Sequence, residues 1–415
     1  MAEHLPEFPP SGEYIHAVRE SSKAVREWAN ITITDAAIER LLLSPAFTTT
    51  FPRLRTAHGY ALPLAFPSPA SELNLLALLS LLNFGSAYRA PLHAAAHRGA
   101  FDTARALVFG LYISSEGADH LTAQGMRAVD AQTIAELMGV ASAIHVERPH
   151  ESIDALTVGE LGGPVWELVS MVTGVMNETG DVLVQGGYPD LGAFVLEALW
   201  EGRKAKDPER ACDVVLERLV RGIPAFRDMA LVQGHPVYCF KKALLTIHSI
   251  ARRFGGAEPS SSTIPVPPGT DNLPLFADNV IPSLLVHLGV LDLSTSTPSL
   301  GLADVFPGAG GAETLAALLA EAPAGVKKGR PTEVPAEGPV LTAEQAYVLR
   351  AAAIDACERI VRVARGLDVG ARGGLGGWMA GITPPEVDAW LWAVAKDRAD
   401  YRQLKRFVQR ETPYF

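Results

Sequence analysis

The sequence predicts a mostly α-helical protein, and three observations support this prediction. Apolar residues recur at helical spacing over residues 14–29 and 35–44. Capping boxes, which mark the starts of helices, occur at Thr342 and at Thr383. Strand signals are few and short, and they do not alternate with helices as they do in a doubly wound sheet. We therefore expect a single helical domain over residues 14–415.

The composition indicates a chain that buries a large core. Apolar residues make up 48% of the 415 residues and charged residues only 20%, which excludes global disorder. Lys and Arg number 36 against 46 Asp and Glu, a net charge of −10. An acidic chain is a poor candidate for stable nucleic-acid binding, which needs many clustered cations. A small phosphorylated ligand, held by a few basic side chains, remains compatible with this charge.

The N-terminal segment and the cysteines indicate a cytoplasmic setting. Residues 1–13 are rich in Pro and Glu and lack an apolar run, so we expect a flexible segment and no signal peptide. The apolar run Leu73–Phe84 is too short to span a bilayer and predicts a buried helix, so no membrane contact is expected. Three cysteines, Cys212, Cys239 and Cys357, have neither disulfide-framework nor metal-site spacing.

Further elements follow from local signals. The Thr342 box opens a helix that Gly366 ends, and the Thr383 box, with Pro at the first helical position, opens one from about Pro384 to Lys396. Short strands are predicted at Val237–Phe240 and at Asp181–Val184.

Two segments rich in Pro, Gly and Ser are predicted to be surface insertions. They cover residues 255–271 and 297–339, and the second contains a short predicted helix over 311–322. Neither segment has enough apolar residues to form a core of its own. We therefore expect both to decorate one domain.

Two motifs favour structural interpretations. His93 and His97 have the spacing of metal ligands on one helical turn, but a third ligand is not evident and Ala94 replaces the Glu of the metalloprotease pattern. The run Gly370–Gly377 follows a helix and lacks the Lys of a phosphate-binding loop, so a loop between two helices is favoured. No metal site is expected.

Basic residues around the predicted strand at 237–240 allow two interpretations. Arg227 and Lys241 have the chemistry of a phosphate clamp. The alternative is an exposed helix face in which Arg227 pairs with Asp228, beside Lys241 and Lys242. Composition by itself favours the alternative.

Two carboxylate and aromatic groupings are candidates for a site. Phe276 and Asp278 precede an apolar helix, where they suit either base stacking and charge stabilisation or an ordinary helix cap. Asp388 and Trp392 lie four residues apart on one face of the predicted helix over 384–396, which suits either a site or core packing. The stretch 396–410 contains six Lys or Arg and is interpreted as a solvated tail.

These motifs, in this order, resemble the queuosine salvage family, the queuosine 5′-phosphate N-glycosidases. The resemblance runs from about residue 14 to the end, and its set of colinear motifs is more specific than any one of them. The matching segments are Arg19–Lys23, Leu82–Phe84, Asn177–Gly180, Ile223–Asp228, Phe240–Lys241, Leu275–Asp278, Pro282, Val286–Gly289, Asp388–Trp392 and Tyr414–Phe415.

The resemblance implies a helical domain similar to DNA glycosylases and an enzyme that hydrolyses the N-glycosidic bond of queuosine 5′-phosphate. The product would be queuine for reuse in transfer RNA, and no cofactor is implied. Carried over by motif, Asp278 is the catalytic carboxylate, Phe276 stacks on the base, and Asp388 hydrogen-bonds the base, with Trp392 beside it. For the 5′-phosphate we expect Lys241, helped by Arg227.

The chain departs from the family pattern at two positions. Ala393 stands where the pattern continues with Asp, and Ala389 stands where many members carry an aromatic residue. Both concern recognition of the base. The first hypothesis is therefore a queuosine 5′-phosphate N-glycosidase, and the alternative is a member that binds a nucleotide or a protein without cleavage.

Overall fold

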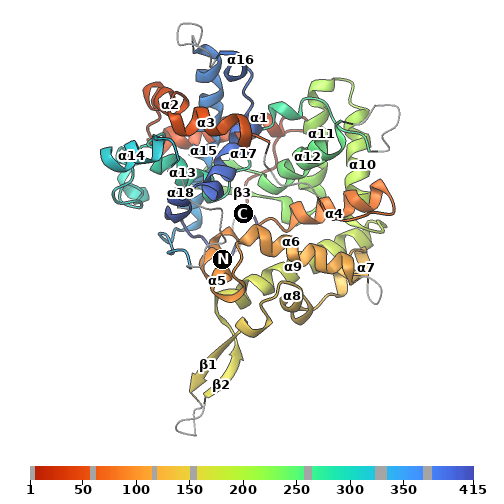
Figure 1. The fold of residues 1–415 in the computed structure, drawn as a ribbon. Helices are drawn as coiled ribbons and strands as arrows, with labels where there is room; N and C mark the ends of the chain where they lie inside the picture. Colours follow the sequence, from red (N-terminus) through yellow and green to blue (C-terminus); the bar gives the residue numbers. More distant parts are fainter. Residues whose placement is uncertain are drawn as a thin grey trace.

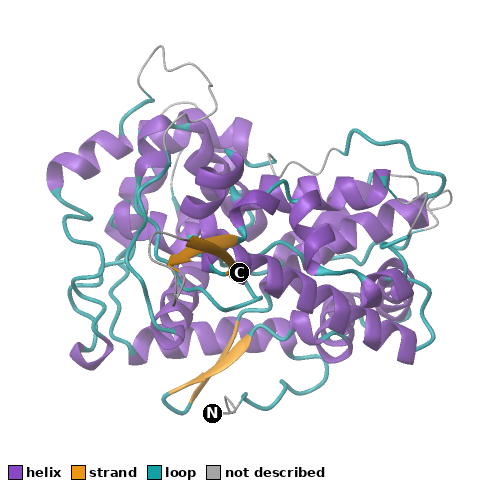
Figure 2. Cartoon of the chain, turned by 90° about the horizontal axis from the view of Figure 1, so that it is seen from below, coloured by secondary structure: helices purple, strands orange, loops and turns teal. Residues whose placement is uncertain are grey.

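The computed structural model describes residues 5–56, 62–114, 119–149, 157–256, 264–322, 334–367 and 376–415. Helices dominate it, and its strands form two separate two-stranded sheets (Figures 1 and 2). The predicted mostly α fold class is thus confirmed. Most of the Gly370–Gly377 run lies outside the described residues.

The first half of the chain contains short helices and one hairpin. Its helices are α1 (Tyr14–Trp28), α2 (Asp35–Leu42), α3 (Pro45–Leu54), α4 (Pro69–Leu81), α5 (Arg89–Ala96), α6 (Ala100–Ile113), α7 (Ala123–Ala128), α8 (Ala131–Leu137), α9 (Gly163–Gln185) and α10 (Leu191–Arg203). The strands β1 (His145–Pro149) and β2 (Thr157–Leu161) pair antiparallel and project away from the helices (Figure 1).

The second half supplies the longest helix and the second hairpin. Its helices are α11 (Ala211–Gly222), α12 (Lys241–Phe254), α13 (Val280–His287), α14 (Ala312–Leu319), α15 (Ala343–Gly366), α16 (Gly376–Met379), α17 (Pro384–Asp397) and α18 (Ala399–Gln403). The strands β3 (Met229–Val232) and β4 (His235–Tyr238) pair antiparallel. Single 3₁₀ turns are η1 (Ser86–Tyr88), η2 (Ala141–Ala143), η3 (Pro208–Arg210), η4 (Pro224–Phe226), η5 (Thr270–Asn272) and η6 (Pro298–Leu300).

Local sequence signals explain most of these boundaries. The side chain of Thr342 accepts the N–H of Gln345, while the side chain of Gln345 accepts the N–H of Thr342, so the predicted capping box of α15 forms. The predicted box at Thr383 also forms at the start of α17. The apolar run predicted as a buried helix is α4, whose residues from Glu72 to Leu81 are all buried.

One strand prediction is wrong. Asp181–Val184 lies inside α9, whose buried face continues through Thr179 and Leu183 at helical spacing. A short apolar run does not distinguish a strand from a helix by itself, and the packing of α9 against α7 decides for the helix. The strand expected at Val237–Phe240 is confirmed as β4, which ends two residues earlier.

Helices around α15 and helices around α4 form the two groups that surround the site. Helix α15 packs against α1, α2, α13 and α17, whereas α4 packs against α6, α10 and α12. The second predicted insertion contributes to this core, because Leu300, Leu302 and Phe306 are buried. Its predicted short helix is confirmed as α14, which packs on α3.

Candidate active site

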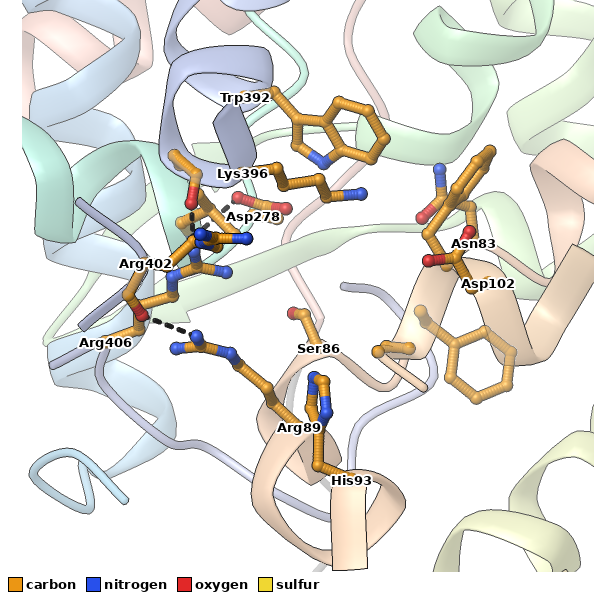
Figure 3. Close-up of a pocket in the computed structure, with 16 residues that line it drawn as sticks. Asn83, Ser86, Arg89, His93, Asp102, Asp278, Trp392, Lys396, Arg402 and Arg406 are labelled. Carbon is orange, nitrogen blue, oxygen red and sulfur yellow. Dashed lines mark hydrogen bonds between the residues drawn. The ribbon is translucent and has the colours of Figure 1, made fainter. Parts of the chain in front are cut away.

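Two adjoining cavities lie where the two groups of helices face each other. The inner cavity, of about 380 Å³ including space open to solvent, is lined by Asn83, Phe101, Lys241, Leu245, Phe276, Asp278, Asp388 and Trp392. The outer cavity, of about 880 Å³ including space open to solvent, is lined in part by Arg89, His93, Asp102, Lys396, Arg402 and Arg406 (Figure 3). Four residues line both cavities, and they are Asn83, Phe101, Asp278 and Trp392.

A buried ion pair holds the loop that carries Phe276 and Asp278. Arg350, in the middle of α15, is fully buried and contacts the carboxylate of Asp228 at 2.9 and 2.5 Å. The same guanidinium donates through Nε to the carbonyl of Ala277, between the two candidate residues, at 2.9 Å. Asp228 also accepts the backbone N–H of Lys241 at 3.0 Å. One pair therefore positions two segments of the inner cavity.

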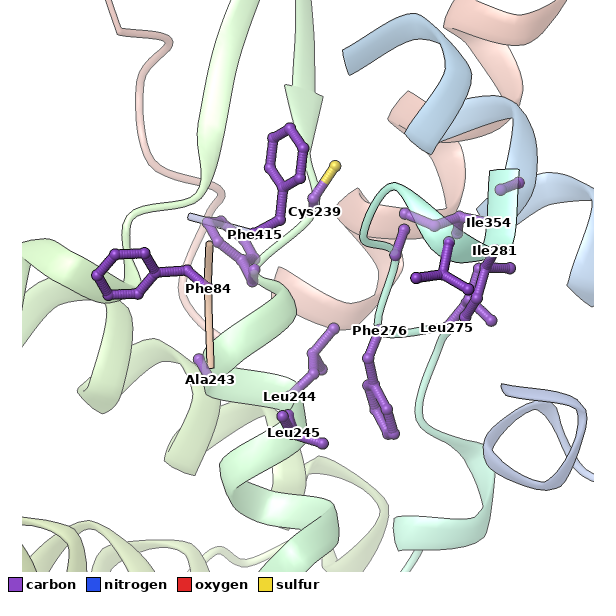
Figure 4. Packing of buried hydrophobic residues seen from close by; sticks show 14 of the residues in the cluster. Phe84, Cys239, Ala243, Leu244, Leu245, Leu275, Phe276, Ile281, Ile354 and Phe415 are labelled. Carbon is purple, nitrogen blue, oxygen red and sulfur yellow. The ribbon is translucent and has the colours of Figure 1, made fainter. Parts of the chain in front are cut away.

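Phe276 and Asp388 are joined directly. The backbone N–H of Phe276 donates to Oδ2 of Asp388 at 3.0 Å, across 112 residues of sequence. Leu275 turns into the core beside Ile281, while the ring of Phe276 points the other way, past Leu245 (Figure 4). Burial, and next the nearby charge of Asp278, raise the pKa of Asp388 well above its ordinary value. A neutral carboxylic acid is therefore favoured at this position.

Asp278 combines a helix cap with a place on the cavity wall. Its Oδ1 accepts the N–H groups of Val280 and Ile281 at 2.7 and 3.3 Å, at the start of α13. An anionic side chain is stabilised at a helix N-terminus. Oδ2 accepts no hydrogen bond from the residues that the structure describes, and Asp278 lines both cavities. The two interpretations that the sequence left open, cap and site, both apply.

Lys241 lies in the inner cavity and is buried. Its Nζ donates to the backbone carbonyl of Asn83 at 2.5 Å and approaches Oδ1 of Asn83 at 3.4 Å. Burial lowers the pKa of Lys241 to about 8, although Asp278 opposes this shift. Lys241 thereby fixes Asn83 at the junction of the two cavities.

Helix α17 presents three site residues along one face. Asp388, Trp392 and Lys396 follow one another at intervals of four residues, so they run from the inner cavity to the outer one. The Nζ of Lys396 lies 3.2 Å from the centre of the Trp392 ring and 5.2 Å from that of Phe101. This stripe connects the two cavities.

The outer cavity contains an excess of positive charge. Arg89, Lys396, Arg402 and Arg406 line it together with two carboxylates, Asp102 and Asp278, which leaves a formal charge of +2. Burial lowers the pKa of Lys396 to about 7 and that of Arg406 to about 9. The cations thus lie where their charged forms are disfavoured, and an anion bound among them would relieve this cost.

The start of α6 adds backbone donors to the same wall. Gly99, at its N-cap, offers no side-chain cap, and residues 99–102 line the outer cavity. The first N–H groups of a helix lack intrahelical partners and attract anions. The start of α6 therefore adds a second source of positive potential to the outer cavity.

The structure brings together five of the six residues predicted from sequence. Phe276, Asp278, Asp388, Trp392 and Lys241 all line the inner cavity. Arg227 lines neither cavity, and its guanidinium donates to the carbonyls of Val220 and Arg221. Its predicted ion pair with Asp228 is also replaced, because Asp228 pairs with Arg350.

Residues 168–299 match the model of the queuosine salvage protein family. This match supports a role in queuosine salvage. The matched segment contains Lys241, Leu245, Phe276 and Asp278, whereas α17 and the cations of the outer cavity lie outside it. No curated protein matches the chain.

The two departures from the family pattern do not reach the cavities. Ala389 and Ala393 are buried in α17, and neither lines the inner or the outer cavity. A carboxylate at position 393 would therefore have to act from another face of the helix than Asp388.

Sequence reasoning missed the cations of the outer cavity. The stretch 396–410, interpreted as a solvated tail, supplies Lys396, Arg402 and Arg406 to the cavity. The interpretation of Lys241 and Lys242 as an exposed face is also wrong, because both are buried. The four-residue spacing of Asp388, Trp392 and Lys396 was the sequence signal that could have placed Lys396 in the site. Arg89 and Phe101 carried no comparable signal.

Other classes of site find little support in the part of the chain that the structure describes. That part contains no cluster of three or more His, Cys, Asp or Glu side chains able to hold a metal ion. His97 is the C-cap of α5 and has a left-handed backbone conformation. His93 and His97 therefore do not both lie within the helix, as their spacing had suggested. Within the same residues, no single helix has the length and apolarity needed to cross a membrane.

Proposed function

We propose that this protein hydrolyses the N-glycosidic bond of queuosine 5′-phosphate and releases queuine. The observation that carries the proposal is the position of Asp278 at the junction of the inner cavity and the cation-lined outer cavity. A nucleotide bound across this junction would place its base inward, its phosphate outward and its ribose beside Asp278. The family match supports the same class of ligand.

The inner cavity suits a flat heterocyclic base. The ring of Phe276 offers a stacking surface, and Trp392 and Phe101 form part of the wall. The protonated carboxyl of Asp388, favoured by its raised pKa, would donate a hydrogen bond to the pyrimidine side of the base. This donor matters because a 7-deaza base has no N7 to protonate as it leaves.

Asp278 would stabilise the charge that develops on the ribose. As the bond between the base and C1′ breaks, its electron pair leaves with the base and C1′ gains oxocarbenium character. A carboxylate beside C1′ stabilises that positive charge and accepts a proton from the attacking water. The hydroxyl of that water completes C1′, and the base takes up a proton. The products are queuine and ribose 5-phosphate.

The phosphate would bind to Lys396 and Arg406 in the outer cavity, with Arg89 beyond them. This replaces the sequence-based expectation of Lys241 and Arg227, since Lys241 lies beside the base position and Arg227 is elsewhere. The formal charge of +2 in the outer cavity matches a phosphate monoester dianion.

Incubation of the purified protein with queuosine 5′-phosphate, with queuine measured by mass spectrometry, tests the proposal. We expect release by the wild type and release about 10³-fold slower by Asp278→Ala. Equal release by both proteins, or none by a wild type that binds the nucleotide, would refute cleavage at this site. The second result would establish the alternative of a binding protein without hydrolase activity.

A further inference from the structure

A groove adjoins the outer cavity. This groove, of about 900 Å³ including open space, is lined by His93, His97, Arg98, Gly99, Asp102, Arg105, Ala106 and Phe109. Three of these residues, His93, Gly99 and Asp102, also line the outer cavity. These three shared residues place the groove next to the outer cavity.

Two arginines supply the charge of the groove. Arg98 is held in place, because its Nη2 donates to the carbonyl of Met138 at 2.8 Å. Its Nε is buried and has no hydrogen-bond partner among the described residues. Arg105 contacts Asp102 at 3.3 Å, and both of these side chains are more than a third exposed. The groove thus contains one anchored and one accessible guanidinium.

The combined charge exceeds what a monophosphate needs. Together, the outer cavity and the groove are lined by two carboxylates, Asp102 and Asp278, and by six cations, namely Arg89, Arg98, Arg105, Lys396, Arg402 and Arg406. The formal charge is +4 with the imidazoles neutral. A phosphate monoester carries at most two negative charges, so a surplus of two remains on the side of the groove.

We propose that the groove is a second phosphate subsite, so that the protein accepts nucleoside 5′-diphosphates as well as 5′-monophosphates. The inference rests on the proposed function for the direction in which the nucleotide lies. An anionic extension of the ligand suits the groove, because Arg98 and Arg105 line it against a single carboxylate, Asp102. Phe109 is its one large apolar residue among those described.

The test compares inorganic phosphate with inorganic pyrophosphate by calorimetry on the full chain. The variants are Arg105→Gln and the double variant Arg98→Gln, Arg105→Gln. The matched control is Arg148→Gln, Arg362→Gln, which removes two exposed arginines that are 67% and 66% exposed and line neither cavity nor the groove. Thermal unfolding verifies that each variant is folded. If the double variant does not fold, the single variant Arg105→Gln carries the test.

We expect pyrophosphate to bind the wild type and the control about 10-fold more tightly than phosphate, because the groove adds charge-assisted hydrogen bonds. In the double variant the ratio should fall to about one while phosphate affinity stays the same. Equal affinities in the wild type, or an unchanged ratio in the variants, would overturn the inference.

The calorimetric result is independent of catalysis. A pyrophosphate preference that depends on Arg105, in a protein that releases no queuine, would keep the subsite and refute the proposed function. Queuine release without such a preference would keep the proposed function and refute the subsite.

Discussion

At the scale of single residues, Asp278 has two roles that one substitution separates. Its Oδ1 caps α13, and its carboxylate lines both cavities. Asn at this position keeps a cap acceptor but loses the negative charge. Ala loses both.

We therefore expect Asp278→Asn to unfold at the temperature of the wild type and to lose about 10³-fold in kcat, as when one transition-state contact is removed. Asp278→Ala should lose the same activity and about 1 kcal/mol of stability as well. Thermal unfolding and initial rates of queuine release measure the two effects. Substantial activity in Asp278→Asn would show that the charge is dispensable.

Lys396 gives the expected phosphate contact a pH dependence. Its pKa of about 7 means that the amine is protonated below pH 7 and neutral above it. The substrate phosphate, with a second pKa of about 6, is a dianion above pH 6. We therefore expect KM to be lowest between these two pH values and to rise on the alkaline side.

Measurement of KM between pH 6 and 8, where Arg406 with its pKa of about 9 stays charged, tests this expectation. Lys396→Arg, which stays charged over that range, should abolish the alkaline rise. Lys396→Met should raise KM at pH 6.5 to about the value that the wild type has at pH 8. A wild-type KM that does not change with pH would contradict the assignment.

At the scale of elements, α15 holds the loop that carries Phe276 and Asp278 through Arg350. The guanidinium joins Asp228, beside β3, to the carbonyl of Ala277, and the hydroxyl of Tyr347 also donates to Asp228 at 3.1 Å. Both charges of the ion pair are fully buried. Loss of one member leaves the other buried without a counter-charge.

We expect Arg350→Met to reduce the free energy of unfolding by about 3–5 kcal/mol because Asp228 becomes unpaired. The double variant Arg350→Met, Asp228→Asn should recover part of this loss, yet its kcat should stay low because the Ala277 carbonyl has lost its donor. Urea unfolding and queuine release measure both properties. Full recovery of kcat in the double variant would show that Arg350 does not position the loop.

At the scale of the whole molecule, the ligand would join the two groups of helices. Lys241 and Leu245 come from α12, Phe101 from α6, and Asp388 and Trp392 from α17. A nucleotide bound between them would contact both groups, whereas the unfolded chain offers no such site.

Saturating queuosine 5′-phosphate should therefore stabilise the inactive Asp278→Asn variant, by about 2.7 kcal/mol at 100 times Kd. Differential scanning calorimetry measures this shift, and free ribose 5-phosphate is the matched control with a smaller effect. No shift with the nucleotide would place its binding site elsewhere.

Much of the fold is predictable because its signals are local. The capping boxes at Thr342 and Thr383 and the apolar periodicity over residues 14–29 depend on neighbours within one or two turns. The strand predicted at Asp181–Val184 is wrong because packing against α7 outweighs four residues of local preference. The similarity to DNA glycosylases and the single-domain organisation remain predictions.

The candidate site, like the fold, was predictable only in part. Phe276, Asp278, Asp388, Trp392 and Lys241 were predicted as one constellation through a family resemblance, and the structure places all five on one cavity. The cations of the outer cavity were not predicted, since a basic residue in an amphipathic or polar segment is usually solvated.

The helical class and the starts of α15 and α17 could thus be read from the sequence, because short-range spacing encodes them, whereas the residues of the inner cavity were predicted through the family resemblance. Only the tertiary structure decided which charges share a cavity. The fold buries Lys241 and leaves Arg227 outside both cavities. It also brings the stretch after Lys396 against Arg89, which donates to the carbonyl of Arg402. The physical reason is that electrostatic potential depends on distance and burial in space, and neither can be read from positions along the chain.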